Sequence, residues 1–542
     1  MTVHFDPHYY PYPSRRNMTY AARGMVCASH PSAAQAGLEV LKKGGNAVDA
    51  IVATAAALTV VEPTGNGIGS DAFALLWKDG RLRGFNSSGP IPKALSMDVA
   101  ESKGWTAPSA GGKLPMLGWA PVTVPGAPKA WAELTRTHGR LTLAENLAPA
   151  IALARDGHAV SVTIAHHWEL ARRKYAALQG DEFRAWFDTF APLGRAPRAG
   201  EIWKSEAHAR TLERIAETDA RSFYEGDIAG RIVAAARKTG GYISPEDLAA
   251  FAPEWVEPIG VNYRGYDVWE IPPNGQGIVA LIALSILRGF DFPSHDDPVT
   301  IHRQIEAIKM GFADAHRYVA DQRFHDVPVA ELLADAYADQ RRAQLGERAE
   351  DRKAGDPMHG GTVYLCAADR DGTMISYIQS NYMGFGSGVV VPDTGIALNN
   401  RGYCFSLDPG HPNVLEPGKR PYNTIIPSFL TKDGVPVGPF GVMGGFMQPQ
   451  GHVQVVMNTV DFEMNPQQAL DAPRWQWMGG MNVSVEPGFS PAVAQSLSRM
   501  GHAVKFELDS YAFGRGEIIW KMPEGSLAGA TESRTDGCVA VW

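Results

Sequence analysis

The chain has 542 residues, of which 45% are hydrophobic and 20% charged, a composition typical of a folded globular protein and not of a disordered one. Lys and Arg number 50 against 58 Asp and Glu, which gives a net charge of −8, and no concentrated basic face is evident. Proteins that bind the nucleic-acid backbone need the opposite bias, so we expect no nucleic-acid partner.

The four cysteines, Cys27, Cys366, Cys404 and Cys538, are far apart and form no CxxC pair. This spacing argues against a zinc cluster and favours a reducing compartment, although a count of four cysteines also allows two disulfides. Residues 1–20 contain no apolar segment typical of a signal peptide. Residues 47–61 are apolar but too few to span a bilayer. We therefore expect a cytoplasmic protein without a membrane partner.

The first half of the chain predicts mainly helices. Apolar residues recur on one face of 32–43, and Gly44-Gly45 follows as a stop signal. Residues 47–61 are nearly all apolar, which predicts a fully buried helix. A β-hairpin is predicted at 72–77 and 82–86, and residues 127–352 are expected to be mostly helical.

The periodicity changes near Thr362. Residues 362–368 and 374–378 predict two strands joined by a turn at Asp371-Gly372. The remainder predicts further strands, with helices at 466–472 and 491–500. Helices that alternate with hairpins over this length indicate a layered α+β fold.

Several patterns are interpreted as structural. Residues 65–69, Gly-Asn-Gly-Ile-Gly, follow a helix and precede a strand, the reverse of a dinucleotide-binding motif, so a tight turn is expected. His166, His167 and His302 are expected at the surface or hydrogen-bonded in the core. A paired or solvated helix face is expected for Glu306, Lys309, Asp314 and Arg317. We expect no metal site and no cofactor.

Gly360-Gly361-Thr362 opens the strand at 362–368. A threonine hydroxyl is a weak nucleophile unless a base lies beside it, and a free N-terminal amine on the same residue can be that base. Such an amine requires a chain break before Thr362, and an unhindered glycine carbonyl would assist it. On this pattern alone, a β-branched residue that merely opens a strand is the simpler interpretation.

Longer segments change that interpretation. They include ASHPSAAQAGLEVLKKGGNAVDAIVATAAALTVVEPTGNGIGSDAFALL within 27–88, GWAPVTVPGAPKA at 118–130, LTLAENLAPAIALARDG at 141–157 and, later, TVYLCAADRDG, IQSNYMGFGSG, PGKRPYNTIIPS and GVMGGFMQPQGH. In this order, and along almost the whole chain, they resemble the gamma-glutamyltransferase (gamma-glutamyltranspeptidase) family, in particular its glutathione hydrolase-like branch.

The resemblance implies an N-terminal-nucleophile hydrolase with a four-layer αββα sandwich, made as an inactive precursor. It implies self-cleavage between Gly361 and Thr362, giving a large subunit 1–361 and a small subunit 362–542 that together form one globular domain. Ser380 matches the hydroxyl residue that hydrogen-bonds the nucleophile. Gly444 and Gly445 match the pair whose amides form the oxyanion hole, a role that the freedom of glycine permits.

The donor-binding positions both match and depart from the family pattern. Asn423 and Thr424 replace the two serines that bind the donor carboxylate. Ser96 is nearest to the place of a carboxylate-binding arginine, and Cys404 stands where an acidic residue holds the donor amine. Arg401 and Tyr382 occupy glutamine and asparagine positions, and 408–419 is shorter than the usual lid loop, which predicts a more open pocket. Glutathione is therefore expected to be a poor donor.

Three functions follow from these observations. The first is a self-processing gamma-glutamyl hydrolase/transferase that passes an acyl group from Thr362 to water or an amine. The second is an N-acyl amidase of the cephalosporin-acylase type, and the third is a non-catalytic member that retains the fold. The expected partners are a small acyl-amide substrate and the two subunits of one precursor, and a homo-oligomer is left open.

Overall fold

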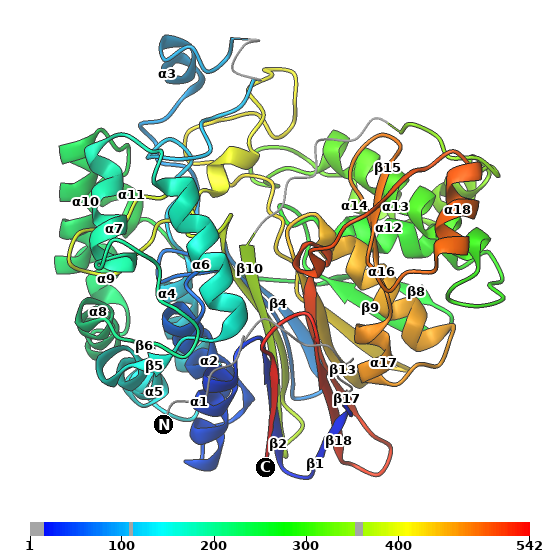
Figure 1. Ribbon diagram of the computed structural model, residues 1–542, viewed down its shortest axis with the longest axis horizontal. Helices are drawn as coiled ribbons and strands as arrows, with labels where there is room; N and C mark the ends of the chain where they lie inside the picture. The colour runs from blue at the N-terminus through cyan, green and yellow to red at the C-terminus, as the bar shows by residue number, and fades with distance from the viewer. Residues whose placement is uncertain (1–15, 108–111, 353–360) are drawn as a thin grey trace, which may run out of the picture.

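A computed structural model describes residues 16–107, 112–352 and 361–542. Two sheets lie face to face in the centre, and helices cover the outer face of each (Figure 1). This arrangement confirms the predicted four-layer αββα sandwich.

Each central sheet has seven strands, and its neighbouring strands are antiparallel. The first has the order β19 (Cys538–Val541), β2 (Gly24–Ala28), β10 (Gly361–Asp369), β11 (Met374–Tyr382), β3 (Asp71–Lys78), β4 (Arg81–Ser87) and β7 (Glu254–Val256). The second has the order β1 (Thr19–Ala21), β18 (Leu527–Thr531), β17 (Arg515–Lys521), β13 (Val435–Met443), β12 (Ser428–Lys432), β9 (Tyr266–Glu270) and β8 (Ile259–Tyr263). Both sheets combine strands from before and after Thr362, so a cut at that residue would leave the two pieces interleaved.

The helices fall into two outer groups (Figure 1). One contains α1 (Pro31–Lys42), α2 (Ala47–Val61), α4 (Ala127–His138), α5 (Leu143–Asp156), α6 (Val162–Tyr175), α7 (Arg184–Phe190), α8 (Glu206–Glu217), α9 (Arg221–Glu225), α10 (Asp227–Thr239) and α11 (Pro245–Ala249). The other contains α12 (Gly277–Leu287), α13 (Pro298–Tyr318), α14 (Val329–Leu332), α15 (Asp335–Arg342), α16 (Met447–Val460), α17 (Pro466–Asp471) and α18 (Pro491–Arg499). In the described ranges, no helix is both long and apolar enough to cross a membrane.

Smaller elements complete the fold. They are α3 (Met97–Ser102), the pair β5 (His158–Ala159) and β6 (Ile202–Trp203), and a sheet of β14 (Trp475–Trp477), β15 (Asn482–Val485) and β16 (Ala503–Phe506). Short 3₁₀ segments lie at Asp181–Phe183, Arg401–Cys404 and Ser510–Phe513.

The strand β10 is buried on both faces. Val363 and Leu365 point into the core between the first sheet and its helices. Tyr364 and Cys366 alternate with them and point into the core between the two sheets. Because a strand in this position has no solvent-facing side, its sequence is apolar almost throughout.

One expectation about secondary structure was incomplete and another was wrong. Residues 127–352 are mostly helical as expected, but they also contain the short strands β5 to β9, and the hairpin β8–β9 turns at Arg264-Gly265, both in the left-handed region. The region after Thr362 contains the 14-residue helix α16, which was expected to be strand. Pro449 and Gly451 weaken its intrinsic helix propensity, but residues 447–458 are all buried, so tertiary packing determines the conformation.

The contact between the sheets leads to a stability prediction at Gly441. A methyl group there would overlap the Tyr364 ring, which is fully buried between the sheets. We expect Gly441→Ala to lower the free energy of unfolding by about 1–3 kcal/mol, the usual cost of overpacking a core. Gly230→Ala, in helix α10 with no atom near the added methyl, should be neutral or stabilising. Urea unfolding of both variants measures this, and equal midpoints would contradict the packing argument.

Candidate active site

Thr362, Ser380 and Gly361 meet at one end of the β10–β11 pair. The Thr362 Oγ1 and Ser380 Oγ atoms are 3.1 Å apart, and the Ser380 hydroxyl donates to the Gly361 carbonyl oxygen at 2.7 Å. A hydroxyl has one proton, so the Thr362 hydroxyl is the donor toward Ser380. Thr362 is 1% exposed. The structure therefore brings the predicted nucleophile, its predicted partner and the predicted cleavage position into direct contact.

Local backbone geometry makes this contact. The β10–β11 register shifts between Gly361 and Val363, and Tyr382, opposite Gly361, has a positive φ of 77°. The Tyr382 N–H donates to Ser380 Oγ at 2.8 Å, which fixes the serine rotamer. Close approach also requires Gly65, where a Cβ would lie 3.2 Å from the Thr362 carbonyl oxygen. The turn at 65–69 thus lies against the nucleophile.

A second buried group contains most of the predicted substrate-binding residues. Arg401 donates to Asp71 Oδ2 at 3.2 Å and to Thr424 Oγ1 at 2.7 Å. Asn423 donates to the same Asp71 oxygen at 2.8 Å, and the Arg401 guanidinium lies 4.6 Å from the centre of the Tyr382 ring. Asp71 is opposite Ser380 in the β3–β11 register, so this group adjoins the nucleophile.

Two charged atoms of this group have no hydrogen-bond partner within the described part of the chain. They are Arg401 Nη2 and Asp71 Oδ1, and both side chains are fully buried. Burial raises the pKa of the Cys404 thiol, although Arg401 opposes this, so Cys404 is neutral and cannot pair with an ammonium ion. The site consequently offers one cationic donor and one anionic acceptor that are unused, and a neutral thiol at the position where the resemblance implies an amine-binding acid.

The two glycines follow strand β13. Gly444 has φ 134° and Gly445 φ 63°, values that side chains rarely adopt. Their carbonyls are occupied: Met447 and Gln448 donate to them, and Gln276 Nε2 donates to the Gly445 oxygen at 2.9 Å. Neither glycine N–H has an acceptor among the described residues. Two amides without acceptors fit the predicted oxyanion hole.

The predictions from sequence missed some residues that organise this region. Gln276 Nε2 also donates to the Thr424 carbonyl oxygen at 2.6 Å and so connects Thr424 with Gly445. Asp71 connects Arg401 with Asn423. Asp71 lies in the sequence GSDAF, which is part of a segment that resembles the family, and this was the only signal in the sequence that could have pointed to Asp71. The sequence held no signal for Gln276.

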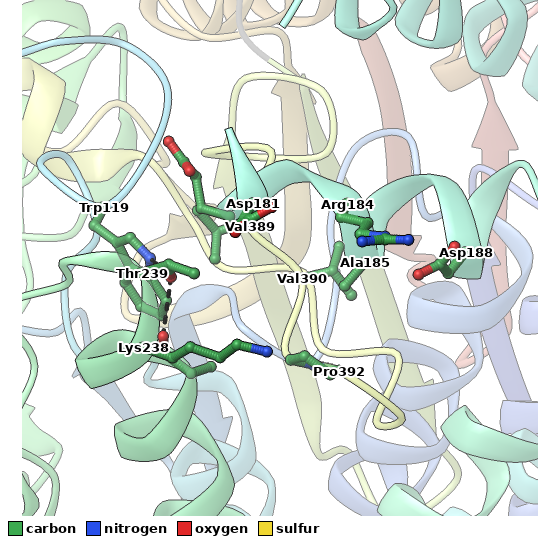
Figure 2. Close-up of a pocket in the computed structure, with 12 residues that line it drawn as sticks. Trp119, Asp181, Arg184, Ala185, Asp188, Lys238, Thr239, Val389, Val390 and Pro392 are labelled. Carbon is green, nitrogen blue, oxygen red and sulfur yellow. Dashed lines mark hydrogen bonds between the residues drawn. The ribbon is translucent and has the colours of Figure 1, made fainter. Parts of the chain in front are cut away.

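Other candidate features lie outside the site. Ser96 caps helix α3 by accepting from the Val99 N–H, so it has a local structural role. A cavity of about 320 Å³ is lined by Trp119, Arg184 and Lys238, among others, and by no predicted site residue (Figure 2). There the Trp119 indole donates to Thr239.

The histidine and helix-face predictions for the right-hand helical layer of Figure 1 are confirmed. His302 is buried and lies 2.9 Å from His502, with its other nitrogen on the Gly346 carbonyl. His302, His502 and Glu306 lie close enough together to suggest a metal site. However, the Lys309 ammonium already contacts Glu306 at 2.6 Å, so we interpret the group as a buried polar network.

Comparison with known proteins places the chain in a family. The family model described as Gamma-glutamyltranspeptidase matches residues 33–542. The chain belongs to the gamma-glutamyltranspeptidase family. It is accordingly an enzyme of the hydrolase/acyltransferase type that the sequence predicted.

Three relatives show how the family varies. The chain is 37% identical to the glutathione hydrolase-like YwrD proenzyme of Bacillus subtilis, over 95% of this chain and 97% of the relative. It is 33% identical to the oxamate amidohydrolase proenzyme of Klebsiella pneumoniae, over 96% and 98%. A crystal structure of cephalosporin acylase from Bacillus halodurans is 58% identical, with a TM-score of 0.96 over 100% of this chain and 99% of that one. The word proenzyme in the first two names implies a precursor that is processed into two subunits.

Proposed function

We propose that the chain cuts its own backbone between Gly361 and Thr362, and that Thr362 then acts as the N-terminal nucleophile of a gamma-glutamyl hydrolase/transferase. One observation carries the proposal: the Ser380 hydroxyl contacts both the Thr362 hydroxyl and the Gly361 carbonyl oxygen. These are the attacking group and the carbonyl of the peptide bond that breaks.

Self-cleavage begins when Thr362 Oγ1 attacks the Gly361 carbonyl carbon. Ser380 stabilises the negative charge that develops on the Gly361 oxygen, because it already donates to that atom. The Gly361–Thr362 C–N bond then breaks, and the hydroxyl proton moves to the Thr362 nitrogen. Water hydrolyses the resulting ester, which frees the Thr362 hydroxyl and a Gly361 carboxylate and leaves subunits 1–361 and 362–542.

In the processed enzyme the new Thr362 amine accepts the hydroxyl proton, and the oxygen attacks the substrate amide. The amides of Gly444 and Gly445 are assigned to the oxyanion of the tetrahedral intermediate. The amine part of the substrate leaves with the proton, and Thr362 retains the acyl group. Water or a second amine then takes up the acyl group, which gives hydrolysis or transpeptidation.

The contacts of Arg401 favour a second candidate, an N-acyl amidase of the cephalosporin-acylase type. A gamma-glutamyl donor carries both a carboxylate and an ammonium group, and the Cys404 thiol, which burial keeps neutral by raising its pKa, supplies no charge partner for the ammonium. An acyl group that carries a carboxylate and no ammonium suits the unpartnered Arg401 Nη2 atom better. The relative of known structure named cephalosporin acylase agrees with this alternative.

Two anilides separate the candidates. Gamma-glutamyl and glutaryl p-nitroanilide differ only in the ammonium group, so their kcat/KM ratio reports on it directly. If Arg401 binds the acyl carboxylate, Arg401→Gln should lower kcat/KM for glutaryl p-nitroanilide by about tenfold or more, as expected for a lost charged hydrogen bond. Arg401→Lys, which retains the charge, is the matched control. An unchanged kcat/KM for glutaryl p-nitroanilide in Arg401→Gln would contradict this role for Arg401.

The proposal extends to a cytoplasmic location. Its support is that Cys27 and Cys366 lie opposite each other on β2 and β10 as free thiols. Cell fractionation with marker enzymes tests this, and recovery outside the cytoplasm would contradict it. The partners proposed are a small acyl-amide substrate and the two subunits of one precursor.

A further inference from the structure

Arg515 connects the two halves of the candidate site. It opens strand β17 and lies opposite Met443, the residue before the predicted oxyanion glycines. Its side chain crosses from the second sheet to the first, where Nη2 donates to the Thr362 carbonyl oxygen at 3.1 Å. This contact does not involve the bond that breaks, so it can persist after self-cleavage.

Glu62 holds the other side of the guanidinium. Its Oε1 atom lies 3.3 Å from Arg515 Nη1, and its Oε2 atom accepts from Ser29 at 2.5 Å. The guanidinium also lies 3.9 Å from the centre of the Tyr511 ring. Arg515 and Glu62 are each at most 1% exposed. A guanidinium held on three sides is a rigid support for the Thr362 backbone.

The pair also brings two opposite charges close to the future amine. The carbonyl oxygen and nitrogen of one residue are separated by two backbone atoms, so the guanidinium lies within about 6 Å of the Thr362 nitrogen. A nearby cation favours the neutral amine, and a nearby anion favours the ammonium form. Only the neutral amine can accept a proton from the Thr362 hydroxyl.

Other titratable groups among the described residues also face this pair. Burial lowers the pKa of His167, whose ring packs 3.5 Å from that of Tyr511, to about 3, so it is neutral in the working range. Burial raises the pKa of Tyr511 and raises that of Glu517 well above its usual value. Burial also raises the pKa of Glu62, although Arg515 and Ser29 oppose this, and Asp536 acts on Glu62 as well. Asp509 and Glu532 act on Tyr511 and Glu517, and the Asp71–Arg401 pair lies beside Ser380. Arg515 is thus the cation in contact with the Thr362 backbone, and Glu62 is its counter-ion.

We propose that Arg515 and Glu62 are a positioning pair for the Thr362 amine. Arg515 fixes the orientation of the amine through the Thr362 carbonyl and favours its neutral, proton-accepting form, while Glu62 limits this effect. The inference rests on the proposed function, because the amine exists only after cleavage between Gly361 and Thr362.

The pH dependence of kcat tests this assignment, because removal of the cation and removal of the anion should shift the acidic limb of the profile in opposite directions. Arg515→Gln removes the cation, so the amine binds its proton more tightly and the acidic limb of the profile should move up by about one pH unit. Glu62→Gln removes the anion, and the limb should move down. Arg515→Lys keeps the charge but loses the simultaneous contacts of the guanidinium with Thr362 and Glu62. We therefore expect kcat to fall about tenfold while the acidic limb stays at the wild-type pH. Lys521→Gln, an exposed charge change at the end of the same strand, is the control.

A second readout does not depend on activity. With ¹⁵N-threonine labelling, the N-terminal amine resonates apart from the backbone amides, and its titration can be followed in each variant. If the wild-type chain is never cut, no such resonance appears, and the proposed function fails. If it is cut and the resonance titrates equally in Arg515→Gln and Glu62→Gln, the positioning pair is refuted while the proposed function stands.

A variant that stays uncut is also informative. If one of Arg515→Gln, Glu62→Gln and Arg515→Lys is uncut, the pH profiles of the other two are compared with that of the wild type. If all three remain folded but uncut, with melting temperatures near that of the wild type, the pair acts in precursor cleavage and its assignment to the amine is wrong.

Discussion

Thr362→Ala is expected to leave a single uncut polypeptide near 58.6 kDa, whereas the wild-type chain separates into 1–361 and 362–542 on a denaturing gel. The variant lacks the only atom at this position that can attack the Gly361 carbonyl, so neither cleavage nor acyl transfer can proceed. We expect activity to fall by about 10⁴-fold or more, as for other removed nucleophiles.

Thr362→Ser is the matched control, because it retains the hydroxyl and should still be cut, although more slowly. Intact-mass measurement after prolonged incubation distinguishes the variants. Cleavage of Thr362→Ala at the same position would contradict the proposed mechanism.

Ser380→Ala has the second largest expected effect. The Ser380 hydroxyl is the donor to the Gly361 carbonyl oxygen and the acceptor for the Thr362 hydroxyl. Loss of a single donor to a developing oxyanion commonly costs about 10²–10³-fold in rate, and we expect self-cleavage to slow by this factor. The measurement is the time course of precursor disappearance after rapid purification.

Ser376→Ala provides a control on the same strand. Ser376 is also buried, but its hydroxyl contacts Tyr364 between the sheets at 2.8 Å and not the nucleophile. Its loss should affect stability and leave the cleavage rate within about twofold, because no atom of the bond that breaks is touched. Equal slowing of both variants would show that Ser380 acts only through the fold.

Elements with a clear pattern were predictable from the sequence. Helix α2 was expected to be fully buried because it has no polar face, and all of its residues are buried. The β10–β11 hairpin followed from β-branched and apolar residues around Asp371-Gly372. In contrast, helix α16 was missed because Pro449 and Gly451 argue against a helix locally, and only its burial against other elements overcomes this.

The site shows the same limit. The resemblance supplied Thr362, Ser380 and the glycine pair, and the structure brings Thr362 into contact with Ser380. It did not reveal that Asp71 is the shared acceptor for Arg401 and Asn423, because these residues come from β3, a 3₁₀ segment and a later loop. Nor could it reveal the contact of Arg515 with Thr362, which joins two different sheets. Such contacts depend on how the layers stack, and a single sequence contains no direct signal for that.

N-terminal sequencing of the small chain from an active preparation decides whether the backbone is cut before Thr362. We expect this chain to begin Thr-Val-Tyr-Leu, with Thr362 first, and we expect chemical blocking of its amine to abolish turnover. A preparation that hydrolyses acyl anilides as an intact 542-residue polypeptide, or a small chain that begins at another residue, would contradict this expectation.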